Sequence, residues 1–390
     1  MNDVNIAIVV VAYNREKSLK RLLNSLSNAF YDNENIELII SIDKSNNKEI
    51  YKIADDFNWK YGEKRIIKHD INLGLRNHIL KCGDIALEND AVIILEDDLL
   101  VSKSFYRYAK QAYEYYKNEE RIAGISLYNY RVNEFSQLRP FIPLQDDSDI
   151  YFAQVPSSWG QMWTREQWLG FRTWYGNGDL DLYNYRGLVP DEILTWKESS
   201  WKKFFHAYLA VNNKYFVYPR VALSTNMGDK GTNNIYASNS HQAILMGSFN
   251  RDFIFKRVDD PSSIKYDAFF ESINIIEKLL LEYGINVIID YYGTKAKYCN
   301  SGYILSVERL DYKIAAQWGL ELVPYELNIE YNIKGNQLFL YDLSKAQKFI
   351  NKYQSVNIIK YENPSMIKKK ALKLCISEYK DAILRKLKLK

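Results

Sequence analysis

The sequence predicts a mixed α/β fold whose mostly parallel sheet carries helices on both faces. Two observations lead to this prediction. Short apolar runs alternate with helical segments through the first 119 residues, in the order strand, helix, strand. The first run, 6–13, is apolar throughout, which is typical of a strand buried on both faces.

Each element follows from its local pattern. Leucines at helical spacing predict a helix after the first strand, and β-branched runs predict the strands that follow it. The expected strands are 6–13, 36–43, 64–70 and 91–95, and the expected helices are 18–30, about 46–61, 74–90 and 103–119.

Parallel strands of this kind bind ligands beyond their carboxyl ends. We therefore expect the ends of three strands to form one rim of the sheet. The residues of this rim are Ala12, Tyr13, Asn14, Arg15, Asp43, Glu96, Asp97 and Asp98.

The residue pattern changes twice after the first 120 residues. Residues 121–250 are irregular and rich in tryptophan, and a further mixture of helices and strands begins near 251. We predict a domain over 1–250 with two parts, 1–130 and 131–250. A smaller α/β domain of unknown role (251–362), including a strand at 356–361, and a basic tail helix (363–390) complete the prediction.

Composition indicates a globular protein whose body is not basic. Hydrophobic residues make up 47% and charged residues 26% of 390 residues, with a net charge of +4. The segment 365–390 holds nine Lys or Arg and two acidic residues, so the remaining chain has a net charge of −3. This distribution argues against a nucleic-acid partner.

Localisation is predicted from cysteine use and apolar runs. Three scattered cysteines are typical of free thiols in a reducing compartment, and no run reaches the length of a membrane span. We expect a cytoplasmic protein. The tail 365–390 either lies on the anionic inner face of the membrane or docks on the protein as an ordinary amphipathic helix.

Three adjacent carboxylates end the fourth strand. Glu96, Asp97 and Asp98 repel one another unless a cation compensates them. Oxygen ligands of this kind suit Mg²⁺ or Mn²⁺, which usually bridge protein carboxylates to substrate phosphates. The alternative is a solvated acidic turn before a helix.

Three other residues of the rim also have two interpretations. Asp43 either accepts the N3–H of a uracil ring or caps the turn that follows it. Arg15 and Arg76 either pair with phosphate or lie on the surface at helix starts.

Four segments together resemble nucleotide-sugar glycosyltransferases of the GT-A type. They are "VVVAYNREKSLKRLLNSL", "SIDKS", "NLGLRN" and "VIILEDDLLVSKSFYRY". The first and third are similar to family-2-like bacterial enzymes, and the Glu-Asp-Asp triplet is similar to that of N-acetylglucosaminyltransferase I. The resemblance covers about 4–130 well and 155–235 thinly.

The resemblance implies a nucleotide-binding role for 1–130 and an acceptor and lid role for 131–250, together with roles for single residues. Asp98 would bind Mn²⁺ or Mg²⁺, Glu96 and Asp97 would contact the donor, and Arg15 and Asp43 would contact its nucleotide. Trp159 resembles the tryptophan of the sugar pocket, with core packing as the alternative. Lys230 lies in a Gly-x-Lys-Gly segment similar to the loop that closes over the donor. His241 either completes the metal shell or is an ordinary histidine.

An inverting transfer needs a carboxylate to take the acceptor proton. In the transferase I family this base lies in an aspartate pair, whose places here hold Ser199 and Ser200. Glu198 is our candidate, with Asp191 and Glu192 in reserve; a solvated helix face is the alternative for all three.

The sequence therefore predicts a metal-dependent enzyme that transfers a sugar from a UDP-sugar to a glycan or lipid-linked glycan, as in bacterial capsule or lipopolysaccharide synthesis. The alternatives are a sugar-nucleotide nucleotidyltransferase and a catalytically silent glycan-binding protein. A retaining mechanism stays open.

Overall fold

The computed structural model divides into two compact units. The first comprises Met1–Gly284 and Thr294–Tyr298, and the second comprises Ile285–Gly293 and Cys299–Lys390. The structure describes residues 4–32, 34–178, 180–229, 240–248, 251–284, 286–295, 302–348 and 355–363, together with 372, 375, 376 and 379.

A nine-stranded sheet forms the centre of the described first unit, and most of its neighbouring strands are parallel. Strand β10 enters antiparallel to both β4 and β6, and β9 is antiparallel to β11. The strands, in order across the sheet, are β13 (Lys265–Tyr266), β9 (Ile150–Ala153), β11 (Tyr215–Pro219), β6 (Ile122–Ser126), β10 (Gln161–Thr164), β4 (Ala91–Glu96), β1 (Ile6–Ala12), β2 (Leu38–Ile42) and β3 (Lys64–Lys68). The predicted α/β fold with a mostly parallel sheet is confirmed.

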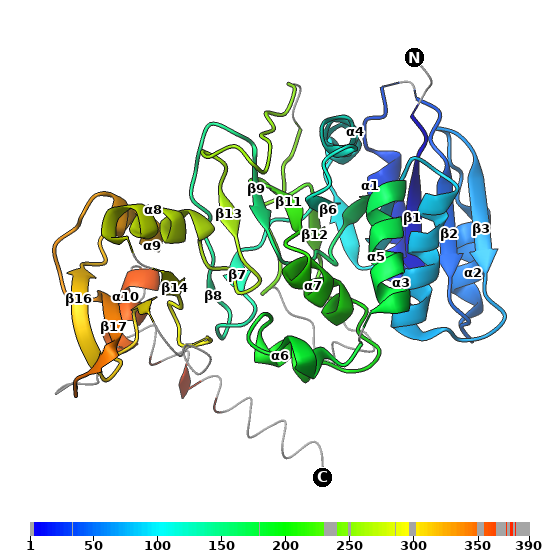
Figure 1. Cartoon of the computed structure of the whole chain (residues 1–390). Helices are drawn as coiled ribbons and strands as arrows, with labels where there is room; N and C mark the ends of the chain where they lie inside the picture. The colour runs from blue at the N-terminus through cyan, green and yellow to red at the C-terminus, as the bar shows by residue number, and fades with distance from the viewer. Residues whose placement is uncertain are drawn as a thin grey trace, which may run out of the picture. The chain divides into compact units, whose positions relative to one another are not determined.

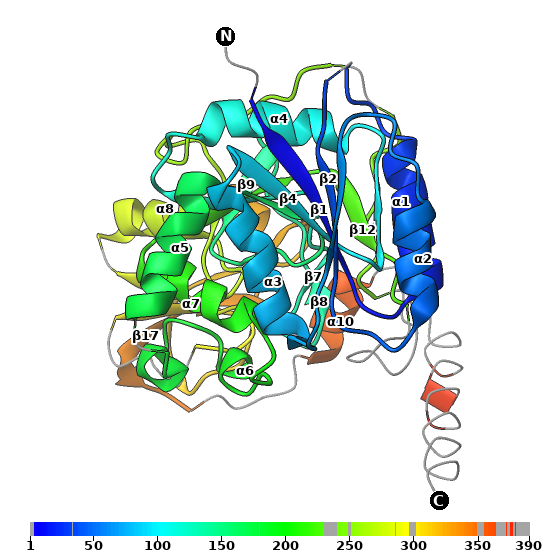
Figure 2. The same ribbon diagram turned by 90° about the vertical axis from the view of Figure 1, so that its right-hand side faces the viewer.

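Helices cover both faces of this sheet, as predicted (Figures 1 and 2). Because successive side chains of a strand point to opposite faces, each strand contributes to two apolar cores. Ile8 and Val10 face one core and Val9 and Val11 the other. The first core holds α1 (Glu16–Ser27), α2 (Lys48–Asp56) and α4 (Phe105–Tyr116), and the second holds α3 (Gly74–Asp84), α5 (Arg165–Asn177) and α7 (Lys202–Val211).

Short elements complete the first unit. They are β5 (Leu99–Val101), paired with β12 (Ser224–Asn226), β7 (Val132–Asn133), paired with β8 (Arg139–Pro140), the four-residue helix α6 (Asp191–Leu194), the 3₁₀ turns Ile85–Leu87 and Leu182–Tyr185, and α8 (Ile273–Tyr283).

The second unit contains a four-stranded sheet. Its order is β14 (Val287–Ile289), β15 (Tyr303–Ser306), β17 (Leu338–Ala346) and β16 (Tyr312–Trp318), with helices α9 (Tyr325–Glu330) and α10 (Ser355–Glu362). The strand expected at 356–361 is wrong, because this segment lies in α10. Ile358 and Tyr361 are three residues apart and therefore share a helix face; Ile358 is buried, and the ring of Tyr361 lies 5.0 Å from that of Tyr325.

No helix among the described residues is both long and apolar enough to span a membrane. The tail helix predicted for 363–390 lies outside the described residues, apart from five isolated positions.

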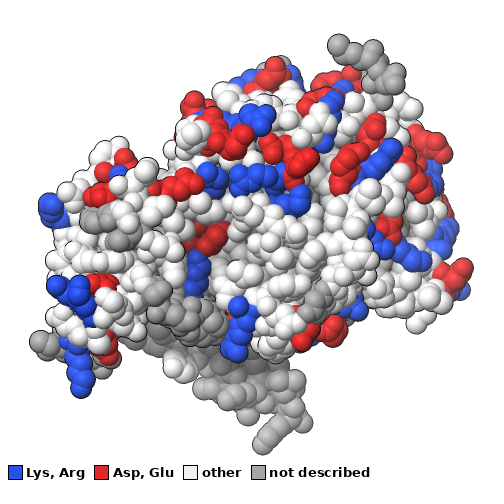
Figure 3. All heavy atoms as spheres, in the orientation of Figure 1, with Lys and Arg blue, Asp and Glu red and all other residues white. Residues whose placement is uncertain are grey.

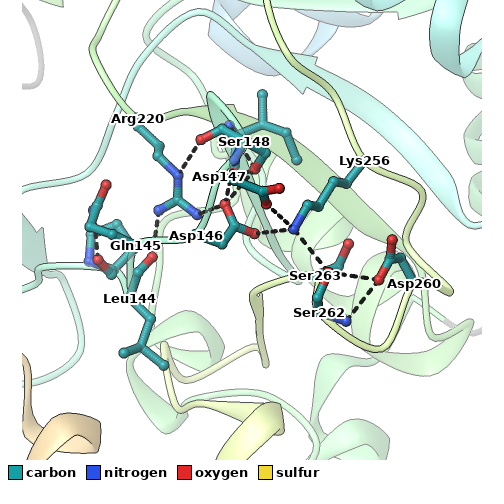
Figure 4. Close-up of polar contacts among 12 residues, drawn as sticks. Leu144, Gln145, Asp146, Asp147, Ser148, Arg220, Lys256, Asp260, Ser262 and Ser263 are labelled. Atoms are coloured by element: carbon teal, nitrogen blue, oxygen red, sulfur yellow. Dashed lines mark hydrogen bonds and ion pairs between the residues drawn. The ribbon is translucent and has the colours of Figure 1, made fainter.

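The division between the units falls near residue 285 rather than at the expected 250. Residues 251–263 are held within the first unit by charged contacts (Figure 4). Lys256 Nζ lies 3.5 Å from Asp146 Oδ2 and also pairs with Asp147. Asp146 in turn accepts a hydrogen bond of 2.7 Å from Arg220, the residue after β11.

Apolar contacts hold the same segment. Phe253 is buried, and its ring lies 5.1 Å from that of Tyr108 in α4. The Tyr116 hydroxyl, also from α4, donates to the Lys256 carbonyl at 2.7 Å. The change of residue pattern near 251 therefore marks an irregular segment of the first unit.

We predict that Phe253→Ala lowers the free energy of unfolding by about 3–5 kcal/mol, because it empties a buried aromatic site. Ile254→Ala is the matched control, since this neighbouring side chain is half exposed, and its effect should stay within about 0.5 kcal/mol. Urea denaturation followed by tryptophan fluorescence measures both. Equal effects of the two substitutions would contradict this account of the segment.

Candidate active site

Three neighbouring parallel strands bring the predicted residues to one edge of the sheet, called the rim below. The Asp43 N–H donates to the Ala12 carbonyl at 3.0 Å, and the Asp97 N–H donates to the Val11 carbonyl at 3.0 Å. The register also sets Val11 beside Glu96. The residues after β1, β2 and β4 therefore lie side by side.

The carboxylates of the triplet divide between the two faces of the sheet. Glu96, the last residue of β4, shares its side with Val92 and Ile94 of the second core, whereas Asp97 follows the strand and is bound by Arg15 at the start of α1. Glu96 therefore faces the side of α7, whereas Asp97 faces the side of α1.

Arg15, at the start of α1, binds two of the three carboxylates. Its Nη1 donates to Asp98 Oδ2 at 2.7 Å, and its Nη2 donates to Asp97 Oδ1. Burial opposes the charge of this guanidinium, but Asp97 and Asp98 outweigh it and raise the pKa of Arg15. One arginine thus compensates part of the charge of the triplet.

Negative charge is left in excess at the rim. Burial, with the repulsion of Asp98, raises the pKa of Glu96 to about 8, although Arg15 and Lys202 favour its charged form. Burial also raises the pKa of Asp97 to about 6, against the attraction of Arg15. A further cation would relieve this repulsion, because an opposite charge favours the ionised carboxylates.

The donor atoms fit a hard divalent cation. The triplet offers only carboxylate oxygens, which suit Mg²⁺ or Mn²⁺. Within the described ranges, no three His, Cys, Asp or Glu side chains converge as a complete metal cage. One or two carboxylates suffice for these cations when substrate phosphates supply other ligands. Asp98 could supply one of them if it exchanged its bond to Arg15 for the metal.

Asp43 is buried and holds the start of α3. Its Oδ1 accepts the N–H groups of Lys44 and Leu73, each at 2.8 Å, and its Oδ2 accepts that of Gly74 at 3.1 Å. Turn capping, one of the two interpretations of Asp43, therefore occurs, and it extends to a second segment 30 residues away. These bonds fix the turn that carries Arg76.

Arg76 and Glu198 meet beside the rim. Arg76 Nη1 lies 3.3 Å from Glu198 Oε2, and Lys203 Nζ lies 2.5 Å from Glu198 Oε1. The Glu198 side chain is 81% exposed. The hydrogen bond from Lys203, helped by Arg76, lowers the pKa of Glu198. A carboxylate stabilised by two cations is a weak base.

The remaining predicted residues are spread more widely. Asp191 begins α6 and lies 3.4 Å from Arg186, and Glu192 beside it is exposed. Asn14 is exposed, and its carbonyl receives a long bond from Asn47 at 3.5 Å. Lys230 lies outside the described residues.

The segment before Lys230 contacts the rim. The Met227 N–H donates to the Asp98 carbonyl at 3.0 Å. Asp229 accepts a hydrogen bond of 2.7 Å from Ser18 and pairs with Arg21, both in α1. Strand β12 and the residues after it are thereby attached next to the triplet.

Trp159 and His241 pack together. Their ring centroids lie 4.7 Å apart at 34°, and Trp159 also lies 4.7 Å from the Tyr128 ring. Burial lowers the pKa of His241. Trp159 is only partly buried, so part of its ring is accessible.

The sequence did not predict a buried ion pair on the side of the sheet that Glu96 faces. Lys202 Nζ lies 2.8 Å from Glu134 Oε2 and 2.9 Å from the Tyr130 hydroxyl. Lys202 follows Glu198, Ser199 and Ser200 in the sequence, where a base is expected, but Glu134 lies 68 residues earlier in an irregular stretch. The sequence shows only a lysine at a helix start. Its burial, which makes a paired carboxylate necessary, is not visible in the sequence.

Residues 7–166 match the family described as Glycosyl transferase family 2. This match covers β1 to the start of α5 and includes the whole rim. Together with the α/β architecture, it shows that this part of the chain is similar to family 2 glycosyltransferases of the GT-A type. None of the curated proteins matches the chain.

Solved structures with a similar chain fold include S. aureus TarS 1-349, at 14% identity and a TM-score of 0.36. The alignment covers 57% of this chain and 60% of that one. TarS 1-349 in complex with UDP-GlcNAc gives 14% identity, a TM-score of 0.38 and coverages of 58% and 60%. PcManGT, a mannosyltransferase from Pyrobaculum calidifontis in complex with GDP-Man and Mn²⁺, gives 13% identity, a TM-score of 0.29 and coverages of 42% and 45%.

The chain thus spans about three fifths of the length of the TarS structures. The likeness to glycosyltransferases rests on the family match to residues 7–166 and on the α/β fold.

The raised pKa of Glu96 predicts a pH dependence of stability without added metal. The folded state holds this proton more tightly than the unfolded state, so stability should fall as pH rises through about 8. Between pH 7.0 and 8.5 the loss should be about 1 kcal/mol. The window avoids the acidic range in which the buried His78 and His206, whose pKa values are lowered to about 4 and about 3, have the opposite effect.

Urea denaturation in a chelating buffer at the two pH values measures this loss, and Glu96→Gln should remove it. An unchanged slope in that variant would show that Glu96 is not the group responsible.

Proposed function

We propose that the protein transfers a sugar from a UDP-sugar to a glycan or lipid-linked glycan, with a divalent cation and inversion at the anomeric carbon. The observation that carries the proposal is the pairing of Arg15 with Asp97 and Asp98 at a rim inside the family match. This arrangement places a guanidinium and surplus carboxylates together, as binding of a metal–diphosphate requires.

Each residue of the rim takes a role in this proposal. Asp98 would hold Mn²⁺ or Mg²⁺, and the cation would offset charge on the leaving diphosphate. Arg15 turns from Asp98 to the phosphates. Glu96 and Asp97 bind hydroxyls of the donor. The nucleotide lies against Ala12, Asn14, Asp43 and Arg76, the sugar lies against Trp159, and Lys230 comes from the segment after Asp229.

The biological setting is part of the proposal. It is a role in surface polysaccharide synthesis at the inner face of the membrane, and its support is the positive charge of the tail 365–390, which suits anionic lipid. On the face shown in Figure 3, acidic and basic side chains of the described residues are intermingled, which does not suit a nucleic-acid partner.

We predict that UDP binds with Mn²⁺ present and that Asp98→Ala weakens this binding at least 10-fold, because the bridge to the diphosphate is lost. Isothermal titration calorimetry with and without Mn²⁺ measures the effect. Asp55→Ala, which removes an exposed partner of Lys68, is the control and should bind as the wild type does. Absence of manganese-dependent UDP binding in the wild type would refute the proposal.

A panel of UDP-glucose, UDP-galactose and UDP-N-acetylglucosamine should then show UDP release. Nucleotide binding without release from any of them would favour a catalytically silent glycan-binding protein.

A further inference from the structure

Lys202 occupies an unfavourable place for a cation. It begins α7, where the helix dipole favours negative charge, and its side chain is only 9% exposed. Burying an ammonium is costly unless it is paired. Its partners are Glu134 at 2.8 Å and the Tyr130 hydroxyl at 2.9 Å. The rings of Trp159 and Trp196 lie within 5.3 and 5.6 Å of its Nζ.

This ion pair lies on the side of the sheet to which Glu96 points. Lys202 is near enough to Glu96 to favour the charged form of that carboxylate. It also contacts Trp159, the tryptophan that precedes β10. The pair therefore belongs to the region between the triplet and the aromatic side chains of the second core.

A second observation points to an occupant of this region. Gln161, two residues after Trp159, is fully buried, and neither its Oε1 nor its Nε2 has a hydrogen-bond partner in the described part of the chain. The side chain shares its face of β10 with Trp163, in the second core. An unsatisfied buried amide is costly, so water or a ligand hydroxyl is its expected partner.

One carboxylate oxygen of Glu134 is available to accept a proton. Its Oε2 is held by Lys202, and no hydrogen bond to its Oε1 is found within the described ranges. The side chain is 14% exposed, so it is shielded but reachable. Glu198, by contrast, is 81% exposed and has both oxygens paired with cations.

We infer that Glu134 is the general base of the proposed transfer and that Lys202 is its positioning residue. This inference rests on the proposed function. The acceptor hydroxyl oxygen attacks the anomeric carbon and forms the new C–O bond. The bond from that carbon to the diphosphate oxygen breaks, and its electron pair leaves with UDP. The acceptor proton passes to Glu134 Oε1, while Lys202 holds Oε2.

The test compares Glu134→Gln with the wild type in two measurements. UDP release is followed with the fastest donor among UDP-glucose, UDP-galactose and UDP-N-acetylglucosamine, with water as acceptor. Binding of UDP with Mn²⁺ is measured by calorimetry. We expect kcat to fall about 100-fold or more, the usual contribution of a general base, with the Kd of UDP within twofold. Retained UDP binding also shows that the variant is folded.

Glu34→Gln is the matched control. Glu34 likewise forms a cluster with a lysine and a tyrosine, accepting from Lys110 and Tyr106, but it precedes β2 at the opposite edge of the sheet. Its UDP release should equal that of the wild type. A kcat above one tenth of the wild-type value in Glu134→Gln, or a large loss confined to Glu198→Gln, would overturn the inference.

The positioning role of Lys202 has its own readout. Lys202→Met should lower kcat without changing the Kd of UDP, and Lys202→Arg should recover part of the loss. In a Glu134→Gln background, Lys202→Met should cost little more, because residues that act as a unit are not additive. Additive losses would refute the positioning role. Absence of manganese-dependent UDP binding in the wild type would instead refute the proposed function itself.

Discussion

The concentration of negative charge after β4 is the constraint on which the rest of the site depends. Glu96, Asp97 and Asp98 stand at the end of a strand that is buried between two cores. Their mutual repulsion cannot be relieved by water alone, since burial raises the pKa of both Glu96 and Asp97. Arg15, at the start of the helix that follows the adjacent strand β1, binds two of these carboxylates.

The alternation of side chains along β4 then separates the carboxylates. Asp97 faces α1 and is bound by Arg15, whereas Glu96 faces α7 and interacts electrostatically with Lys202. A single strand end thus supplies charge to two regions, one suited to a metal–diphosphate and one lined by aromatic rings. This geometry explains how three consecutive residues can have different partners.

The contacts that join these regions connect distant parts of the chain. Asp229 binds α1 across more than 200 residues, and Lys202 reaches Glu134 across 68. Residues 251–263 are likewise held to the first unit by Lys256 and Phe253. Local patterns contain no information on such pairs, which is why the sequence indicated neither the Lys202–Glu134 pair nor the attachment of residues 251–263 to the first unit.

The sequence by itself determined the class of fold and the position of the rim. Apolar runs such as 6–12 and 91–95 require burial on both faces, and parallel strands bring their carboxyl ends to one edge whatever the details of packing. The tertiary structure alone decided which charges meet. Arg15 pairs with Asp97 and Asp98, and both oxygens of Asp43 accept backbone N–H groups. Glu198 pairs with two cations. Burial and pairing set the electrostatics of a carboxylate, and both depend on residues that only folding brings near.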